Sequence, residues 1–285
     1  MSRSAQAKRV MNALKKIEKE SKHRSINELR IIVALERAIA RLEIHLSQYL
    51  IFKGGFVLFK TADTARFTRD VDALAVGLKR PRISEMVEQA LKEDLGDGLW
   101  FGDLVVEDLP DQGPYGGYRF NCAFQIGEPP KGPKIKIKRL SRIHIDIGFG
   151  DPIIGKPDKQ MMLSILIDGK PVSWSVYPLE SIFSEKLEAL FSRGSANSRA
   201  KDVYDMALIF PKCSGTKDIL RAIQLTFAHR KTPIPESFER AARTFDLSIM
   251  RSAWPSVELT EFTPSFDETW STFLECLRTL DSTRG

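Results

Sequence analysis

The segment from Phe52 to Leu74 has the sequence FKGGFVLFKTADTARFTRDVDAL, in which a Gly54-Gly55 pair precedes an Asp70-Val-Asp72 motif. Side chains alternate between the two faces of a strand, so Asp70 and Asp72 point to one side while Val71 points into the core. Two carboxylates about 4 Å apart repel each other by about 1 kcal/mol in water and by more at a protein surface. The motif therefore predicts a bound cation, and Mg²⁺ suits carboxylate oxygens combined with substrate phosphates.

The Gly54-Gly55 pair predicts a phosphate-binding turn. Glycine allows close approach of the backbone, and a helix that begins after the pair would direct its positive end at a triphosphate. On either side of a polar connection, residues 51–60 and 69–76 are expected to be rich in β-structure.

The later segment Arg142-Ile-His-Ile-Asp-Ile-Gly148 alternates in the same way and places His144 and Asp146 on one face. If this strand lies beside residues 69–76, three carboxylates meet, as two-metal phosphoryl transfer requires. Asp146 is then the third metal ligand and the candidate base. Two alternatives stay open: Asp146 pairs with Arg142 or a lysine, and His144 is a packed or solvent-edge histidine.

Length and composition indicate a globular chain. The 285 residues are 42% hydrophobic and 28% charged, which excludes collagen-like, disordered and miniature classes. No apolar stretch approaches the ~20 residues of a membrane span, and no secretory signal is recognisable, so we expect a cytoplasmic protein without membrane partners. Three cysteines without CxxC spacing indicate reduced thiols, not disulfides or a zinc site.

The excess of positive charge lies in one N-terminal arm. Residues 1–24 contain eight basic and two acidic side chains, whereas the rest of the chain contains 35 of each. Such an arm attracts polyanions, so nucleic acid is a candidate partner, and a solvated helix face is the alternative.

Hydrophobic periodicity predicts helices at 5–21, 26–50 and 82–95 and, after Pro178, at 179–193, 198–210, 215–229, 235–245 and 266–280. Strands are expected at 104–106, 118–126, 135–147 and 161–167. We therefore predict an α/β (α+β) fold in two lobes, in which a basic helical pair (1–50) packs on an α/β core (51–175) with a mixed sheet, followed by a helical lobe (176–285).

Four pieces in this order resemble the AbiEii/AbiGii nucleotidyltransferase toxins, which include the MenT group and have a DNA polymerase β-like core. They are the Gly-Gly pair, Arg66-Phe-Thr-Arg-Asp-Val-Asp72, Asp146, and the helical segments Phe183–Leu190 and Arg199–Asp205. The wider superfamily usually has Gly-Ser where this chain has Gly54-Gly55, with fewer residues before the acids. This departure bears on how the chain would bind phosphate and leaves the metal-binding acids unaffected.

The helical segments supply a second group of candidates. Lys186 borders an apolar helix face from which its ammonium could reach a phosphate. On the next predicted helix, Asp202 and Asp205 share a face, and an ion-pair ladder of Arg199 with Asp202 and Lys201 with Asp205 is the alternative. The resemblance implies that Lys186 is catalytic and that Asp202, or as second choice Asp205, holds it.

The resemblance also implies a function. Asp70, Asp72 and Asp146 would hold Mg²⁺, while Gly54, Gly55, Arg66, Lys186 and Asp205 would bind the nucleotide in a cleft between the lobes. The chain would transfer NMP from NTP to an acceptor hydroxyl, with the tRNA 3′ end implied, in a toxin–antitoxin or abortive-infection system with a cognate antitoxin. Alternatives are a non-catalytic RNA- or protein-binding module and a nucleotidyltransferase for a small molecule or a protein.

Two further features remain open to interpretation. The basic run of residues 131–142 is either an RNA-facing wall or protection of an edge strand against aggregation. Tyr115 and Tyr118 are candidates for stacking on a base, whereas Phe120 is expected in the core.

Overall fold

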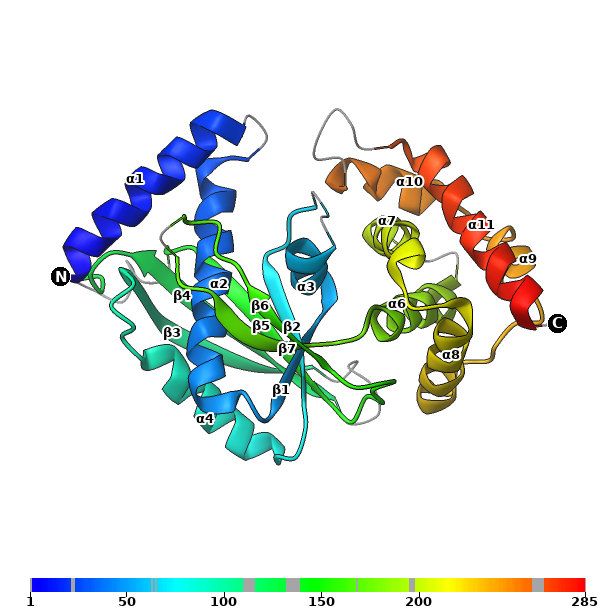
Figure 1. Ribbon diagram of the computed structural model, residues 1–285, viewed down its shortest axis with the longest axis horizontal. Helices are drawn as coiled ribbons and strands as arrows, with labels where there is room; N and C mark the ends of the chain where they lie inside the picture. Colours follow the sequence, from blue (N-terminus) through cyan, green and yellow to red (C-terminus); the bar gives the residue numbers. More distant parts are fainter. Residues whose placement is uncertain are drawn as a thin grey trace. The chain divides into compact units, whose positions relative to one another are not determined.

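The structure, a computed structural model, describes residues 2–21, 24–62, 64, 66–109, 116–131, 139–167, 169–194, 198–257 and 264–284 (Figure 1). The chain forms two compact units. The first contains residues 1–60, 67–150 and 159–176, and the second contains residues 61–66, 151–158 and 177–285. The fold is thus mixed α/β, as the sequence predicts.

A mixed sheet with the strand order β3-β4-β5-β2-β1-β7-β6 organises the first unit. Strand β2 pairs with β5 and β1 pairs with β7 in parallel, whereas β1–β2, β3–β4 and β4–β5 are antiparallel. The strands are β1 (Leu50–Lys53), β2 (Asp70–Ala75), β3 (Leu99–Leu109), β4 (Gly117–Ile126), β5 (Arg142–Phe149), β6 (Asp158–Met162) and β7 (Val172–Val176).

Helix α2 (Ile26–Leu46) packs against β5, β7 and helix α4 (Arg80–Lys92). Its start is fixed by a complete capping box, in which Ser25 and Glu28 exchange side-chain and backbone hydrogen bonds. Helix α1 (Arg3–Ser21) packs on α2 through Ala7, Val10 and Leu14, and leaves Lys8, Arg9, Lys15, Lys16 and Lys19 exposed.

Only the first part of residues 51–60 is the β-structure that the sequence predicts. Strand β1 ends at Lys53, and helix α3 (Gly54–Thr61) follows at once. Gly54 has φ +74°, a left-handed conformation that few side chains tolerate, so the glycine turns the chain from strand into helix. Phe56 of α3 packs edge-on against Trp174 of β7 with ring centroids 6.3 Å apart, so the helix is held by the sheet.

The second unit is mainly helical. Helix α6 (Leu179–Arg193) contacts α7 (Ala200–Ile209) and α8 (Thr216–Arg230), while α11 (Phe266–Arg284) contacts α7, α8 and α9 (Phe238–Ala242). The short helix α10 (Ser248–Ala253) contacts α7. Phe183, Phe227, Phe238 and Phe273 are buried in this unit and form its apolar core.

No helix among the described residues is long and apolar enough to span a membrane. The three cysteines are free thiols, and burial raises the pKa of each to about 12.

Candidate active site

The candidate acids of the first unit lie on two neighbouring parallel strands. The β2–β5 register places Asp72 opposite Asp146 and Asp70 opposite His144. Directly opposed residues share a face of the sheet, so all three acids lie on one side. Val71 and Ile145, which alternate with them, are buried on the other side. The condition set by the sequence, that residues 142–148 run beside residues 69–76, is met.

We call Asp70, Asp72 and Asp146 the acid row. Two cations extend this row across the sheet. Arg119 of β4 lies opposite Asp146, and the buried Lys53 at the end of β1 lies opposite Asp72. Side chains from four adjacent strands thus line up, with a cation at each end and two acids between them: Arg119, Asp146, Asp72 and Lys53.

Arg119 binds Asp146 through two hydrogen bonds. Its Nε donates to Asp146 Oδ1 at 2.8 Å and its Nη2 to Oδ2 at 2.6 Å. The hydrogen bonds to Asp146 raise the pKa of Arg119, and the charges of Asp146, Asp70 and Asp72 raise it further. The guanidinium thus lies in the combined field of all three acids. The partner of Asp146 in the structure is thus Arg119, whereas Arg142 binds Asp103 at 2.7 Å.

His144 is paired with an acid. Its Nδ1 lies 3.2 Å from Asp70 Oδ1, and both side chains are partly exposed. The pairing follows from the register, which sets the two residues opposite each other, and it agrees with a histidine at the solvent edge of the site.

Gly54 brings the start of α3 against Asp72. A Cβ atom at position 54 would overlap the Asp72 carboxylate, so any larger residue would have to displace this side chain. The positive end of α3 therefore lies at the acid row, where it favours negative groups. Gly55 follows in the first turn of the same helix.

The candidates of the helical segments gather within the second unit. Lys186 Nζ on α6 lies 2.5 Å from Asp202 Oδ1 and 2.9 Å from Asp205 Oδ2, both on α7. Lys186 therefore contacts both acids that the sequence left as alternatives. Arg199 also reaches Asp202, at 2.9 Å, so the pair expected for an intrahelical ladder coexists with the lysine contact.

Arg66 joins the same cluster from the segment 61–66. Its Nε and Nη2 donate to the two oxygens of the fully buried Asp205 at 3.0 and 2.8 Å. Burial alone would raise the pKa of Asp202, but the charges of Lys186 and Arg199 outweigh burial and lower it to about 2. For Lys186, burial lowers the pKa, but Asp202 and Asp205 outweigh this effect, so the ammonium stays charged.

The donor set of the acid row fits a divalent cation, because hard carboxylate oxygens from adjacent strands are the ligands that Mg²⁺ prefers. The geometry is not that of a preformed cage: within the described ranges, no group of three or more His, Cys, Asp or Glu side chains is arranged to hold a metal ion. In this structure Arg119 occupies both oxygens of Asp146.

Sequence reasoning missed Arg119 and Lys53. Lys53 is adjacent to the glycine pair, and that position alone could have drawn attention to it. Arg119 lies in a predicted strand between aromatic residues, and nothing in the local pattern connects it with Asp146.

The remaining candidates lie elsewhere. Tyr118 packs edge-on against Phe120 and Phe149, with Arg80 stacked over its ring, and Phe120 is buried as expected. Tyr115 and Lys134, Lys136 and Lys138 of the basic run lie outside the described residues.

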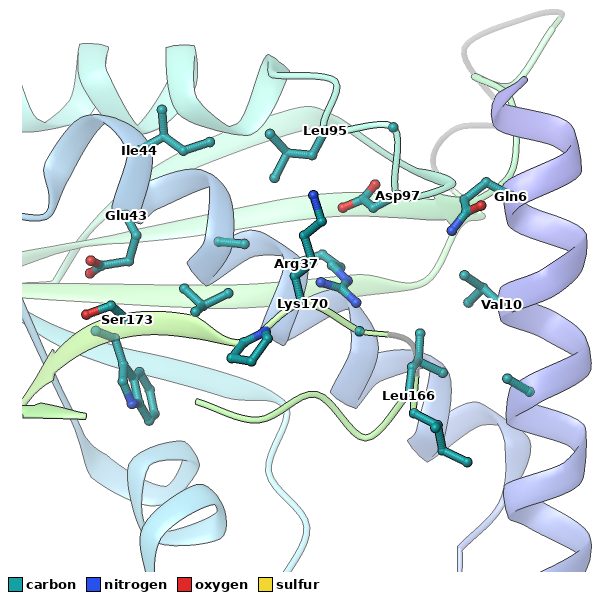
Figure 2. Close-up of a pocket in the computed structure, with 18 of the residues that line it drawn as sticks. Gln6, Val10, Arg37, Glu43, Ile44, Leu95, Asp97, Leu166, Lys170 and Ser173 are labelled. Carbon is teal, nitrogen blue, oxygen red and sulfur yellow. The ribbon is translucent and has the colours of Figure 1, made fainter. Parts of the chain in front are cut away.

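A hollow of about 970 Å³ in the first unit contains none of the candidate acids of the row. It lies between α1, α2, the loop at 95–97 and the segments around β6 and β7. Figure 2 shows Arg37 and Lys170 in the middle, with Glu43 and Ser173 on one side and Val10 and Leu166 on the other. Burial raises the pKa of Glu43 to about 7, against the opposing charge of Lys159.

A family model described as "Nucleotidyl transferase AbiEii toxin, Type IV TA system" matches residues 37–278, most of the chain and parts of both units. No match is found among curated proteins. The fold is similar to the crystal structure of JHP933 from Helicobacter pylori, with a TM-score of 0.52 and 15% identity over 91% of this chain and 94% of that chain. A second H. pylori crystal structure, described as a candidate nucleotidyltransferase, matches with a TM-score of 0.52 and 15% identity over 88% and 93%.

Proposed function

The chain belongs to the AbiEii family of nucleotidyltransferase toxins of type IV toxin–antitoxin systems, and from this premise we propose that Asp70, Asp72 and Asp146 form its catalytic centre. The observation that carries the proposal is the register of β2 and β5, which brings acids 74 positions apart onto one face of the sheet, Asp72 directly beside Asp146. Asp70, Asp72 and Asp146 would hold Mg²⁺, which when bound neutralises charge on the phosphates.

In the proposed reaction an acceptor hydroxyl attacks the α-phosphorus of an NTP. A bond forms between the hydroxyl oxygen and phosphorus, the bond from phosphorus to the bridging oxygen of the β-phosphate breaks, and pyrophosphate leaves. Asp146 accepts the proton of the hydroxyl. Positioning and charge neutralisation supply most of the rate enhancement in such transfers.

Gly54 and Gly55 are proposed to receive the phosphates at the start of α3. The support is the close approach of Gly54 to Asp72, which sets backbone N–H groups and the positive helix end beside the acids. A phosphate bound there would lie next to the proposed metal ligands.

Lys186 is proposed to neutralise charge on the phosphates during the transfer, with Asp202 and Asp205 as the acids that keep it protonated. Arg66 is proposed to support nucleotide binding indirectly. Its guanidinium holds Asp205, and Asp205 in turn contacts Lys186.

We propose RNA as the acceptor, with the 3′ end of tRNA as the specific substrate. One support is the set of exposed basic residues on α1, which can bind the phosphates of RNA. The other is the toxin family, because a blocked 3′ end of tRNA would stop translation and so explain toxicity. The family also implies a cognate antitoxin.

Incubation with Mg²⁺, each α-labelled NTP and total tRNA tests this function. We expect label in RNA from the unmodified protein and a loss of about 100-fold or more for Asp72→Asn, because this change removes a charge at the centre while keeping its shape. Asp108→Asn is the matched control, since Asp108 is an exposed acid on β3, in the same sheet.

The other outcomes separate the alternatives. Label in protein or in a small molecule would show that the acceptor is not RNA. The absence of any label would favour a non-catalytic binding module. Full incorporation by a folded Asp72→Asn protein would remove the acid row from the mechanism.

A further inference from the structure

Arg119 contacts the acid row directly, yet no part of the proposed reaction uses it so far. Its two hydrogen bonds to Asp146 form the bidentate pair that guanidinium and carboxylate groups make at their strongest. Asp146 is only 5% exposed, and its bidentate pair with Arg119 offsets the cost of burying this charge.

Arg119 differs from its partner in its freedom to move. About a third of its side chain is exposed, at 35%, whereas Asp146 is fixed in the middle of the sheet. The guanidinium of this half-buried side chain sits at the end of a long, rotatable stem, whereas the register of β2, β5 and β4 fixes the position of Asp146.

The contact conflicts with the role proposed for Asp146. The two hydrogen bonds use one lone pair on each oxygen of Asp146 and draw electron density from the carboxylate, which weakens it as a ligand for Mg²⁺ and as a proton acceptor. Asp146 is therefore a stronger metal ligand and a stronger base once Arg119 has left it.

We propose that Arg119 is an exchangeable counter-cation, which pairs with Asp146 until a nucleotide binds. In the nucleotide-free protein it neutralises Asp146, and when an NTP enters with its divalent ion it transfers its two hydrogen bonds from Asp146 to the phosphates. Guanidinium binds phosphate with the same bidentate geometry that it uses for carboxylate, so the exchange conserves its bonds while it frees the oxygens of Asp146. The inference rests on the proposed function, because it assumes that the acid row binds the metal ion.

This exchange makes metal and nucleotide binding cooperative. Without nucleotide, binding of the metal ion requires the Arg119–Asp146 pair to break, so the affinity of the protein for the metal ion is reduced. With nucleotide, the phosphates take up the guanidinium. By thermodynamic reciprocity the metal ion then improves nucleotide binding by the same factor.

Binding of Mn²⁺ followed by electron paramagnetic resonance tests the exchange without any turnover. We expect Arg119→Met to bind Mn²⁺ about tenfold more tightly than the unmodified protein in the absence of nucleotide, since the competing hydrogen bonds are gone. Phosphates of a non-hydrolysable NTP analogue also bind Mn²⁺ directly, so we expect both proteins to gain affinity for Mn²⁺, and the unmodified protein to gain about tenfold more than Arg119→Met. Arg80→Met is the matched control: Arg80 is equally exposed and pairs with Asp108, and its loss should leave Mn²⁺ affinity unchanged.

A second variant protects the test against misfolding. Arg119→Lys keeps one charge but not the planar fork, and we expect Mn²⁺ affinity between those of the unmodified protein and Arg119→Met. Unchanged or weaker Mn²⁺ binding in folded Arg119 variants would overturn the inference and leave the proposed function standing. If Mn²⁺ binding is insensitive to Asp72→Asn in every background, the metal site itself is misassigned, and the inference fails with it.

Discussion

At the scale of single residues, charge compensation explains the geometry around the acid row. A carboxylate as buried as Asp146 is costly unless it is paired, and Arg119 supplies the pair within the sheet. Asp205 has the same need in the second unit, and Arg66 together with Lys186 meets it. Each candidate acid of low exposure is thus paired with at least one cation, which offsets the cost of burying its charge.

Glu43 provides a residue-scale prediction of pH dependence. Its Oε1 is buried without a hydrogen-bond partner among the described residues, and its pKa is raised to about 7 by burial. Between its ordinary value near 4.5 and about 7, the folded protein binds a proton that the unfolded chain releases, so stability falls as pH rises through this window.

We therefore expect Glu43→Gln to leave the free energy of unfolding nearly unchanged near pH 4 and to raise it by about 1 kcal/mol at pH 8, after allowance for solvent screening of a half-exposed group. Urea unfolding at the two pH values measures this difference. Glu85→Gln on the exposed face of α4 controls for a general loss of negative charge. Equal effects of Glu43→Gln at both pH values would contradict the assignment.

The residues of the acid row were only partly predictable. Strand alternation alone places Asp70 with Asp72 and His144 with Asp146, because it depends on neighbours in the sequence. The pairing of Asp146 with Arg119 depends on the register between β4 and β5, which long-range packing sets. This is why the sequence offered Arg142 or a lysine as the partner.

At the scale of elements, the same distinction between local and long-range information holds. Helix α6 begins and ends where periodicity predicts, at residues 179 and 193, because one amphipathic pattern defines it. The sequence leaves α3 ambiguous: a phosphate-binding turn at Gly54-Gly55 requires a helix after the pair, whereas residues 51–60 are expected to be rich in β-structure. Phe56, Val57 and Leu58 form an apolar run that fits a strand or a buried helix equally well. Strand β7, which pairs in parallel with β1, and helix α10 were missed, because both are short.

Helix α1 carries the element-scale prediction. Lys8, Lys15 and Lys19 are exposed on it, and each phosphate contact adds to the salt dependence of nucleic-acid binding. We expect replacement of all three by Gln to weaken tRNA binding at low salt and to flatten the plot of log affinity against log salt by up to about two units. The exposed Lys92, Lys217 and Lys231, replaced together, are the control set. An unchanged slope in the α1 variant would show that RNA binds elsewhere.

At the scale of the whole molecule, the proposed machinery is divided between the two units. The acid row, Arg119 and the start of α3 belong to the first, whereas Lys186, Asp202, Asp205 and Arg66 belong to the second. The family match covers parts of both units. Each cluster is complete within its own unit, so each can be tested by itself.

The measurement that tests the central assignment most directly is anomalous diffraction from crystals grown with Mn²⁺ and a non-hydrolysable NTP analogue. A manganese peak in contact with the carboxylates of Asp72 and Asp146, with Arg119 withdrawn from Asp146 toward the phosphates, is the predicted result. A nucleotide-bound manganese ion held by other side chains, with Asp146 still paired to Arg119, would contradict it.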